Sequence, residues 1–316
     1  MQLKKYFQKC TELNKFYTKI KWRQRRVSYG KENPDKTFYV IRRATSKVGL
    51  FSYVMTNLGH IKYAVENGYI PIVDMQNNAN TYLEECEIGR KNAWEFYFKQ
   101  PCGYTLSDIS RSKNVILGNG IIDGSINFPG ALIAHDDKAF ALWKQIADNY
   151  LSVTDEIDEA IEAERKRLFS NDKMLGVLAR GTDYVHSRPY KHPVQPEVQD
   201  IITKCTEVME EYQCKKIYLV TEDKDIFNEF VRVFGNKIVS LDVERYCAFP
   251  GENINDVMQR NETKSVYQRG REYLLSVLLL SRCNCLVAGN AGGSQAALLF
   301  SNGYEYKYVF DLGVYA

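Results

Sequence analysis

The sequence predicts an α/β protein with two domains, each built around a mainly parallel sheet. With 316 residues, the chain is longer than one ordinary hydrophobic core supports, and it fits two domains of about 150 residues. Short apolar runs alternate with longer amphipathic patterns, which is typical of parallel strands covered by helices on both faces. We therefore expect two α/β halves that divide near residues 150 to 170 and face a central cleft.

Residues 1–26 form a basic arm ahead of the two domains. The arm holds nine Lys or Arg and one acidic residue, a charge of +8, so the rest of a chain with net charge +3 carries −5. Apolar residues recur in the arm at helical spacing: Leu3, Tyr6, Phe7, Cys10, Leu13, Phe16, Tyr17 and Ile20. Such a helix either lies on an anionic membrane surface or packs on the body with its lysines in solvent. The acidic body gives no case for nucleic-acid binding.

The N-terminal domain is assigned to residues 27–165. Its predicted elements are a strand at 37–43, a helix at 53–68, strands at 69–75 and 114–118, and helices at 136–150 and 154–169. Residues 76–113 are polar, aromatic and poorly periodic, so we expect long loops over the cleft.

The C-terminal domain, residues 166–316, alternates more regularly. Strands are predicted at 173–180, 215–221, 236–242, 284–289 and 306–313, with helices at 195–212, 223–235, 270–283 and 294–303. An irregular stretch at 243–265 interrupts this order. The alternation predicts a parallel sheet with helices on both faces.

An arginine ends the first strand of this second half, in "LARGTDY". In open α/β sheets ligands bind beyond the carboxyl ends of the strands, and Gly181 lets the chain turn sharply after Arg180. A guanidinium placed there can hold phosphate oxygens through paired hydrogen bonds, with Thr182 and Asp183 orienting it. The alternative is that Arg180 pairs with Asp183 and only closes the loop.

A glycine-rich turn, "GNAGGSQAALLF" at 289–300, joins a later strand to a helix. Glycines 289, 292 and 293 permit close backbone approach, while the N–H groups near Ser294 and the helix dipole favour an anion. The turn matches neither a Walker A loop nor GxGxxG, and a simple tight strand-to-helix turn is the alternative.

A third strand end carries carboxylates in "LVTEDKD", residues 219–225. Such a carboxylate can accept from a guanine edge or from ribose hydroxyls, but Asp223 fits a helix N-cap equally well. Asp223 and Asp225 also spell DxD, which in some glycosyltransferases binds a metal. The residues that follow are helical, and Arg180 with the glycine turn can neutralise the phosphate charge. We therefore expect no metal at this DxD sequence.

These strand ends together describe a site for a diphosphate with a nucleoside attached. The order of the motifs resembles the fucosyltransferase superfamily, which includes core α1,6-, bacterial α1,2- and protein O-fucosyltransferases. The motifs span residues 174–300, about 40% of the chain. The resemblance implies a GT-B fold, with two Rossmann-like domains facing a central cleft, and inverting, metal-independent transfer of fucose from GDP-fucose to a glycan hydroxyl, without a cofactor.

The resemblance also implies roles for individual residues. Arg180 is expected to hold the β-phosphate and to stabilise the leaving diphosphate. The other donor-binding candidates are Gly181, Thr182, Thr221, Glu222, Asp223, Gly292, Gly293, Ser294 and Gln295. Several relatives carry a glutamate shortly after the arginine as a proposed base, and this chain reads "TDYVHSRPY" there instead. Asp183 and His186 are the local candidates for a base, Asp74 is a third, and a mechanism without a strong base stays open.

The acceptor is assigned to the N-terminal half, where the candidate residues are Asn57, His60, Asp74 and Asn77. Aromatic residues suited to stacking on sugar rings accompany them, although most such residues are core by default. The basic arm fits an enzyme that works on a lipid-linked glycan beside a membrane. The alternatives are the same fold with another nucleotide sugar, or a non-catalytic nucleotide-binding scaffold.

The cysteines and the apolar runs bear on the compartment. Eight cysteines are scattered without a CxxC pair, so we expect reduced packing residues rather than disulfides or a zinc site. No apolar stretch has the roughly 18 residues of a membrane span, and the N-terminus is too charged for a signal peptide. These features predict a cytoplasmic protein, at the inner face of the membrane if the arm binds it.

Overall fold

The computed structural model describes residues 11–181, 188, 190–247 and 264–316, and it gives two compact units. Segments of both units alternate along the chain, so neither unit is continuous in sequence. The first unit takes the described residues up to 48, together with 56–128 and 149–152, and the second takes 49–55, 129–148 and the described residues from 153 onward.

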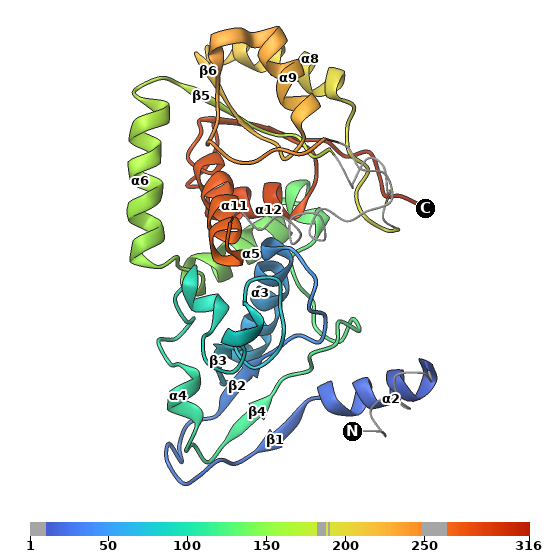
Figure 1. The fold of residues 1–316 in the computed structure, drawn as a ribbon, viewed down its shortest axis with the longest axis vertical. Helices are drawn as coiled ribbons and strands as arrows, with labels where there is room; N and C mark the ends of the chain where they lie inside the picture. The colour runs from blue at the N-terminus through green and yellow to red at the C-terminus, as the bar shows by residue number, and fades with distance from the viewer. Residues whose placement is uncertain (1–10, 182–187, 189, 248–263) are drawn as a thin grey trace. The chain divides into compact units, whose positions relative to one another are not determined.

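The first unit is built on a four-stranded sheet in the order β1-β4-β2-β3. Its elements are α2 (Thr11–Trp22), β1 (Arg25–Val27), β2 (Phe38–Ile41), α3 (Leu50–Glu66, whose residues before 56 belong to the second unit), β3 (Ile70–Val73), η1 (Glu85–Glu87), η2 (Ala93–Phe96), α4 (Leu106–Ile109) and β4 (Val115–Leu117). Strand β2 is buried throughout and pairs in parallel with both β3 and β4. The strands and the helix α3 predicted for this half are therefore present (Figure 1).

Strand β1 joins the end of the basic arm, residues 1–26, to the sheet of the first unit. It pairs antiparallel with β4, with Arg25 opposite Leu117. Two arginines and a valine give no strand pattern in sequence. The strand forms because the backbone N–H and C=O groups along one edge of β4 pair with it. Trp22, at the end of α2, is also buried, and a Cβ at Gly120 would lie 2.3 Å from its ring.

Residues 76–113 are largely irregular, as expected, and they contribute buried side chains to the core. The Trp94, Tyr97 and Phe98 side chains are fully buried. Asn92 holds this segment onto β3, because its side chain donates to Val73 O at 2.8 Å and accepts from Met75 N at 3.1 Å. The aromatic residues are therefore packing groups, and the Asn92 side chain supplies hydrogen bonds to backbone groups that have no regular secondary structure to pair with.

The second unit is built on a five-stranded parallel sheet in the order β7-β6-β5-β8-β9. Its elements are η3 (Ala131–Ala134), α5 (Asp137–Tyr150), α6 (Asp155–Phe169), β5 (Met174–Leu178), α8 (Val198–Glu211), β6 (Lys216–Val220), α9 (Lys224–Phe234), η4 (Gly235–Lys237), β7 (Ile238–Val239), α11 (Val266–Leu280), β8 (Cys285–Ala288), α12 (Gly292–Phe300) and β9 (Tyr306–Val309). The parallel sheet predicted for this half is confirmed. Strand β7 is shorter than predicted, because η4 occupies the start of its range.

Helices cover both faces of this sheet. Leu175 and Val177 of β5 pack in one apolar cluster with side chains of α8 and α9. The alternate position, Gly176, faces α11, where a Cβ would lie 2.7 Å from Leu280 Cδ1. A strand buried on both faces explains why β5 reads as a continuous apolar run.

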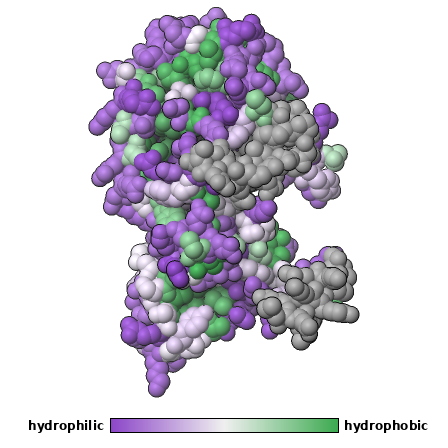
Figure 2. Space-filling view, in the orientation of Figure 1, coloured by the Kyte–Doolittle hydropathy of each residue, from purple (hydrophilic) through white to green (hydrophobic). Residues whose placement is uncertain are grey.

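Hydrophilic side chains predominate on the face drawn in Figure 2, and apolar residues form separate patches there. Among the described residues, no helix combines the length and the apolar character needed to span a membrane. Four of the described cysteines, at 205, 214, 283 and 285, are buried, whereas those at 86, 102 and 247 are exposed. Packing therefore accounts for only part of the cysteine content.

Candidate functional site

The carboxyl ends of β5 and β8 lie at the switch point of the second sheet, where the order in which strands are added reverses. Along the chain, β6 and β7 are added on one side of β5, and β8 and β9 on the other. Gly289 N, just after β8, donates to Leu178 O at 3.1 Å, so the segments that follow both strands start side by side. Such a switch point is where doubly wound sheets bind ligands.

Arg180 lies at this point, two residues after β5, and pairs with a carboxylate from the next strand. Its Nε is 3.2 Å from Glu222 Oε1, and both side chains are 14% exposed. The same oxygen accepts from Gly181 N at 3.1 Å. The predicted arginine and one of the predicted carboxylates are therefore brought together, in a pair that water reaches only in part.

Gly181 is required by a close approach of Asp223. A Cβ at position 181 would lie 2.3 Å from Asp223 Oδ2 and 2.7 Å from Asp223 Cβ. Any larger residue would have to displace Asp223 or the turn that carries Arg180. Glycine here serves the packing of two strand ends as well as the turn.

Asp223 caps helix α9. Its Oδ1 accepts from Asp225 N at 2.8 Å and from Ile226 N at 3.0 Å, and the residue is buried. Thr221 is buried as well, and its hydroxyl accepts from Asp223 N at 3.2 Å. Of the two alternatives for Asp223, the structure shows the N-cap, which engages Oδ1, and the contact with a nucleoside stays a prediction.

The glycine turn after β8 leads into α12, and its side chains face inward. Ser294 is fully buried; its hydroxyl accepts from Ala291 N at 2.9 Å and lies within hydrogen-bond distance of Gly289 O, at 2.8 Å. Gln295 is also buried and donates to Asn290 Oδ1 at 3.0 Å. These two side chains brace the turn from within, and their predicted contact with a ligand stays a prediction.

The two glycines at the start of α12 differ in their surroundings. Gly293 is buried, and a Cβ there would lie 2.9 Å from Leu178 Cδ1, so this glycine lets α12 pack on β5. Gly292 is half-buried, and a Cβ at that position would meet its neighbours only at ordinary van der Waals distances. Its backbone in the first turn is the part of the motif that remains available to an anion.

Gln195 is a supporting residue that the sequence did not indicate. It is buried, and its Nε2 donates to Asn290 O at 2.9 Å and to Pro193 O at 3.1 Å. Its Oε1 lies so near Gly289 that a Cβ there would be only 2.3 Å away. A lone glutamine before a proline carries no sequence signal for this role, because Asn290 lies 95 residues further along the chain.

Thr182, Asp183 and His186 lie outside the described residues. Their roles, including that of a catalytic base, remain predictions. Tyr246, at the edge of the irregular stretch 243–265, does contact the site region, because its backbone N donates to Glu222 O at 2.8 Å. This contact extends the end of β6 by a short parallel bridge.

The first unit holds the four acceptor-side candidates, at the end of β3 and on α3. Asp74 is buried after β3 and accepts from Gln76 N and Asn77 N, each at 3.0 Å, and from Asn77 Nδ2 at 3.0 Å. Both carboxylate oxygens thus stabilise the turn, which weakens the assignment of Asp74 as a base. Asn77 itself is exposed.

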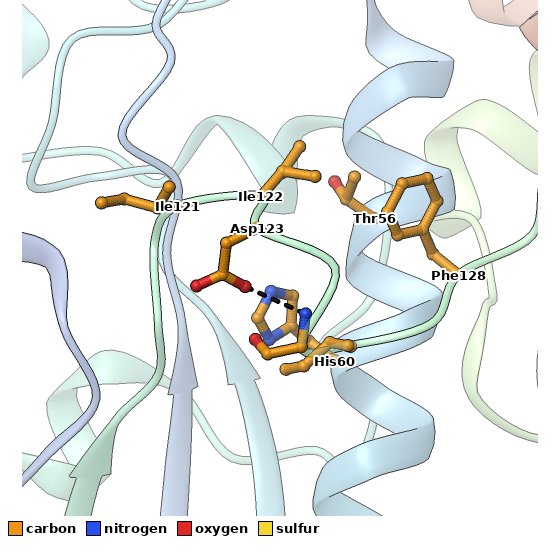
Figure 3. Close-up of a pocket in the computed structure, with 8 residues that line it drawn as sticks. Thr56, His60, Ile121, Ile122, Asp123 and Phe128 are labelled. Atoms are coloured by element: carbon orange, nitrogen blue, oxygen red, sulfur yellow. Dashed lines mark hydrogen bonds between the residues drawn. The ribbon is translucent and has the colours of Figure 1, made fainter. Parts of the chain in front are cut away.

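Asn57 and His60 lie one turn apart on α3. Asn57 is buried, and its Nδ2 has no hydrogen-bond partner among the described residues. His60 lines a small pocket with Thr56, Asp123 and Phe128, shown in Figure 3. The room in that pocket, about 10 Å³, is close to what a single water needs. The pocket is therefore too small for a monosaccharide.

Burial governs the charge of His60. Burial, and then the nearby Arg43, lower the pKa of His60 to about 4, against the opposing effect of Asp123. The imidazole is therefore neutral at pH 7, and its Nδ1 shares a hydrogen bond of 3.0 Å with Tyr39 Oη. Hydrogen bonds from Ser125 and Asn119 lower the pKa of Asp123 and keep it ionised.

Groups able to hold a metal are not clustered in the part of the chain that the structure describes: no three His, Cys, Asp or Glu side chains gather there. The DxD sequence at Asp223 and Asp225 lies at the start of α9, where Asp223 already serves as the cap.

Sequence comparison finds no matching family profile and no similar curated protein. Solved structures do match. The crystal structure of the fucosyltransferase NodZ from Bradyrhizobium is similar with a TM-score of 0.51 at 14% identity, over 88% of this chain and 96% of that one. POFUT1 in complex with GDP is similar with a TM-score of 0.53 at 10% identity, over 87% of this chain and 99% of that one.

POFUT1 in complex with GDP-fucose is similar with a TM-score of 0.50 at 12% identity, over 88% of this chain and 99% of that one. Identities this low establish a likeness of fold and nothing finer. The predicted α/β fold of the GT-B type is confirmed: this chain has the fold of the fucosyltransferases that its motifs resemble.

Proposed function

We propose that this protein is a glycosyltransferase that transfers fucose from GDP-fucose to a glycan hydroxyl, with inversion and without a metal. One observation carries the proposal: Arg180, paired with Glu222, lies at the switch point of a parallel sheet, and α12 begins shortly after β8, the strand next to β5. The similarity in fold to POFUT1, which was crystallised with GDP-fucose, supports the choice of donor.

Arg180 is the group we assign to the diphosphate. A guanidinium offers two parallel N–H donors to phosphate oxygens and stays charged at any physiological pH. The start of α12, where Gly292 is half-buried, adds backbone N–H groups and the positive end of the helix dipole. As the bond from the sugar to the diphosphate breaks, these groups stabilise the charge that develops on the leaving group.

We assign to Glu222 the role of orienting the Arg180 guanidinium before the diphosphate binds. Its Oε1 accepts from Gly181 N and contacts Arg180 Nε, so the guanidinium is held through one edge. A bound diphosphate would compete for the same cation and draw part of its charge from the carboxylate. Binding therefore exchanges one partly buried ionic partner of Arg180 for another. This exchange costs less free energy than removing a fully hydrated arginine from water.

Inversion follows from a single displacement. The acceptor hydroxyl oxygen forms a bond to the anomeric carbon while the bond from that carbon to the diphosphate breaks, and GDP leaves with the electron pair. The hydroxyl proton passes to a base, for which Asp183 and His186 are the candidates. A metal is unnecessary in this scheme because Arg180 and α12 take the charge, and Asp223 is already engaged as a helix cap.

The test is a thermal-shift series on the full-length protein with GDP, UDP, ADP, CMP and GDP-fucose, in EDTA and then in Mg²⁺ and Mn²⁺. A ligand at about 100 times its dissociation constant adds about 2.7 kcal/mol to the free energy of unfolding. We expect GDP and GDP-fucose to stabilise the protein, in EDTA as well as with metal. Arg180→Ala should abolish the shift, and Arg232→Ala, which removes an exposed Arg–Glu pair on α9, should keep it.

Other results would change the assignment. Stabilisation by UDP rather than GDP would retain a nucleotide-sugar site and reject GDP-fucose. Stabilisation only with Mn²⁺ or Mg²⁺ would reject the metal-independent mechanism. Absence of a shift with every nucleotide would reject the donor site, and binding without transfer to any glycan would favour a non-catalytic scaffold.

A further inference from the structure

Helix α2 exposes its apolar side, which is unusual for an amphipathic helix joined to a folded unit. Four apolar residues, spaced three or four apart, share one side of the helix: Leu13, Phe16, Tyr17 and Ile20. At about 100° per residue they cover an arc roughly 100° wide. Phe16 is 63% exposed, and the other three are between 44% and 54% exposed.

The helix is anchored by its opposite side. Trp22 lies roughly 180° around the helix from the middle of the apolar stripe, and it is only 7% exposed. Its ring packs on Gly120 and lies under the Arg42 guanidinium, 5.3 Å from the ring centroid. The anchor therefore turns the stripe away from the part of the first unit that Trp22 contacts.

The surroundings of the stripe are strongly basic. Between Leu13 and Arg26 the chain has six Lys or Arg and no acidic residue. Lys19 and Lys21 lie about 40–60° beyond the two edges of the stripe, where long side chains can reach past an apolar surface; in this structure the Lys21 Nζ lies over the Trp22 ring, 5.3 Å from its centroid. Arg23, Arg25 and Arg26 follow and are exposed.

We propose that α2 is a docking surface for an anionic lipid bilayer. The apolar stripe would enter the boundary between headgroups and acyl chains, and the flanking cations would bind lipid phosphates and carboxylates. A second copy of the chain fits less well, because a symmetric contact through this stripe would bring two sets of six cations together. This inference is independent of the proposed sugar-transfer activity.

Co-sedimentation of the full-length protein with vesicles tests the inference. The vesicles are phosphatidylcholine alone, or phosphatidylcholine with about 30% phosphatidylserine, at about 0.1 M salt. We expect binding to the anionic vesicles, a partition at least about tenfold lower on the neutral ones, and release at about 0.5 M salt.

Two variants address the two halves of the surface. Phe16→Ser with Ile20→Ser removes the stripe, and Lys19→Gln with Lys21→Gln removes the flanking charge; each should lower partition at least about tenfold. The matched controls are Leu132→Ser with Leu312→Ser and Lys166→Gln with Lys237→Gln, which change exposed residues elsewhere and should bind like the unchanged protein.

Two outcomes would overturn the inference. Equal binding to neutral and anionic vesicles, or α2 variants that bind as well as their controls, would show that the surface does not dock on anionic lipid. Concentration-dependent sedimentation of the vesicle-free protein that Phe16→Ser with Ile20→Ser abolishes would assign the stripe to self-association instead. Circular dichroism melting of each variant checks that the fold is kept.

Discussion

The carboxyl ends of the two sheets carry similar side chains and use them differently. Each end has a buried aspartate that accepts from two successive backbone N–H groups: Asp74 in the first unit and Asp223 in the second. Each end also has an arginine near the end of its first parallel strand. Arg42 donates to Gly118 O at 2.8 Å and to Arg23 O at 2.9 Å, whereas Arg180 is paired with Glu222.

This difference separates structural groups from the candidate ligand-binding group. An arginine whose N–H groups donate to backbone carbonyl oxygens, as Arg42 does, holds segments of the fold together. An arginine held by a carboxylate at a switch point can exchange that carboxylate for a phosphate. The comparison therefore supports the proposal that Arg180, rather than either aspartate, binds the diphosphate.

The largest expected effect comes from exchanging the two arginines for alanine. Arg180→Ala should lower the rate of transfer by about 10²–10³-fold, because the charge of the leaving diphosphate loses its main partner. Arg42→Ala should lower the melting temperature and leave the rate of the remaining folded protein near that of the unchanged protein. Assays of fucose transfer and thermal melts on both variants measure this. Similar losses of rate for both would contradict the division of roles.

A pH effect on stability is expected from the first unit. The pKa of His60 is about 4 in the folded protein and about 6.5 when unfolded. Above pH 6.5 His60 is neutral in both the folded and the unfolded protein, so it causes no loss of stability. Between pH 6.5 and 4 the unfolded protein binds the proton more readily than the folded one, so the free energy of unfolding falls as the pH falls. The loss reaches at most about 3 kcal/mol.

Urea unfolding at pH 7, 5.5 and 4 measures this effect, with His60→Gln as the comparison. The glutamine variant should lose less stability on acidification than the unchanged protein. Parallel pH profiles for the two proteins would show that His60 does not carry the effect.

The close approach of the two strand ends in the second unit predicts a smaller effect. Gly181→Ala would bring a methyl group against Asp223 and should destabilise the protein by about 1–3 kcal/mol. Gly49→Ala is the control, because no atom lies within 4 Å of a Cβ there. Chemical denaturation compares the two. An unchanged stability for Gly181→Ala would mean that the turn after β5 is less tightly packed than the structure shows.

The smallest effects are expected from the two aspartates. Asp74→Ala and Asp223→Ala should each cost about 1 kcal/mol of stability, and the asparagine variants less, because an amide oxygen still accepts the backbone N–H bonds. Nucleotide binding should survive in Asp223→Asn. Loss of GDP binding in that variant, with stability retained, would instead return Asp223 to the role of a nucleoside-binding residue.

Much of the fold was predictable because local pattern and burial agree. Strands such as β5, buried on both faces, read as continuous apolar runs, and helices between them read as amphipathic segments. Arg180 was predictable as a site residue for a related reason: a charged residue directly after a buried strand, followed by a glycine, has few structural explanations.

The rest depended on partners that are distant in sequence. The strand character of β1 comes from pairing with β4, and the inward direction of Ser294 comes from the carbonyls of the turn that it closes. Neither the Arg180–Glu222 pair nor the support of Asn290 by Gln195 follows from spacing, since the partners come from different strands and loops.

By itself, then, the sequence determined the α/β class, the order of most strands and helices, the basic amphipathic character of residues 11–26 and the strand end that bears the arginine, because each of these is a property of neighbouring residues. The tertiary structure decided which polar side chains are already hydrogen-bonded to other groups of the protein and which glycines are needed for close packing. It also decided that the apolar side of α2 faces outward. Those outcomes depend on which distant backbone and side-chain atoms satisfy each buried polar group, and a local pattern does not contain that information.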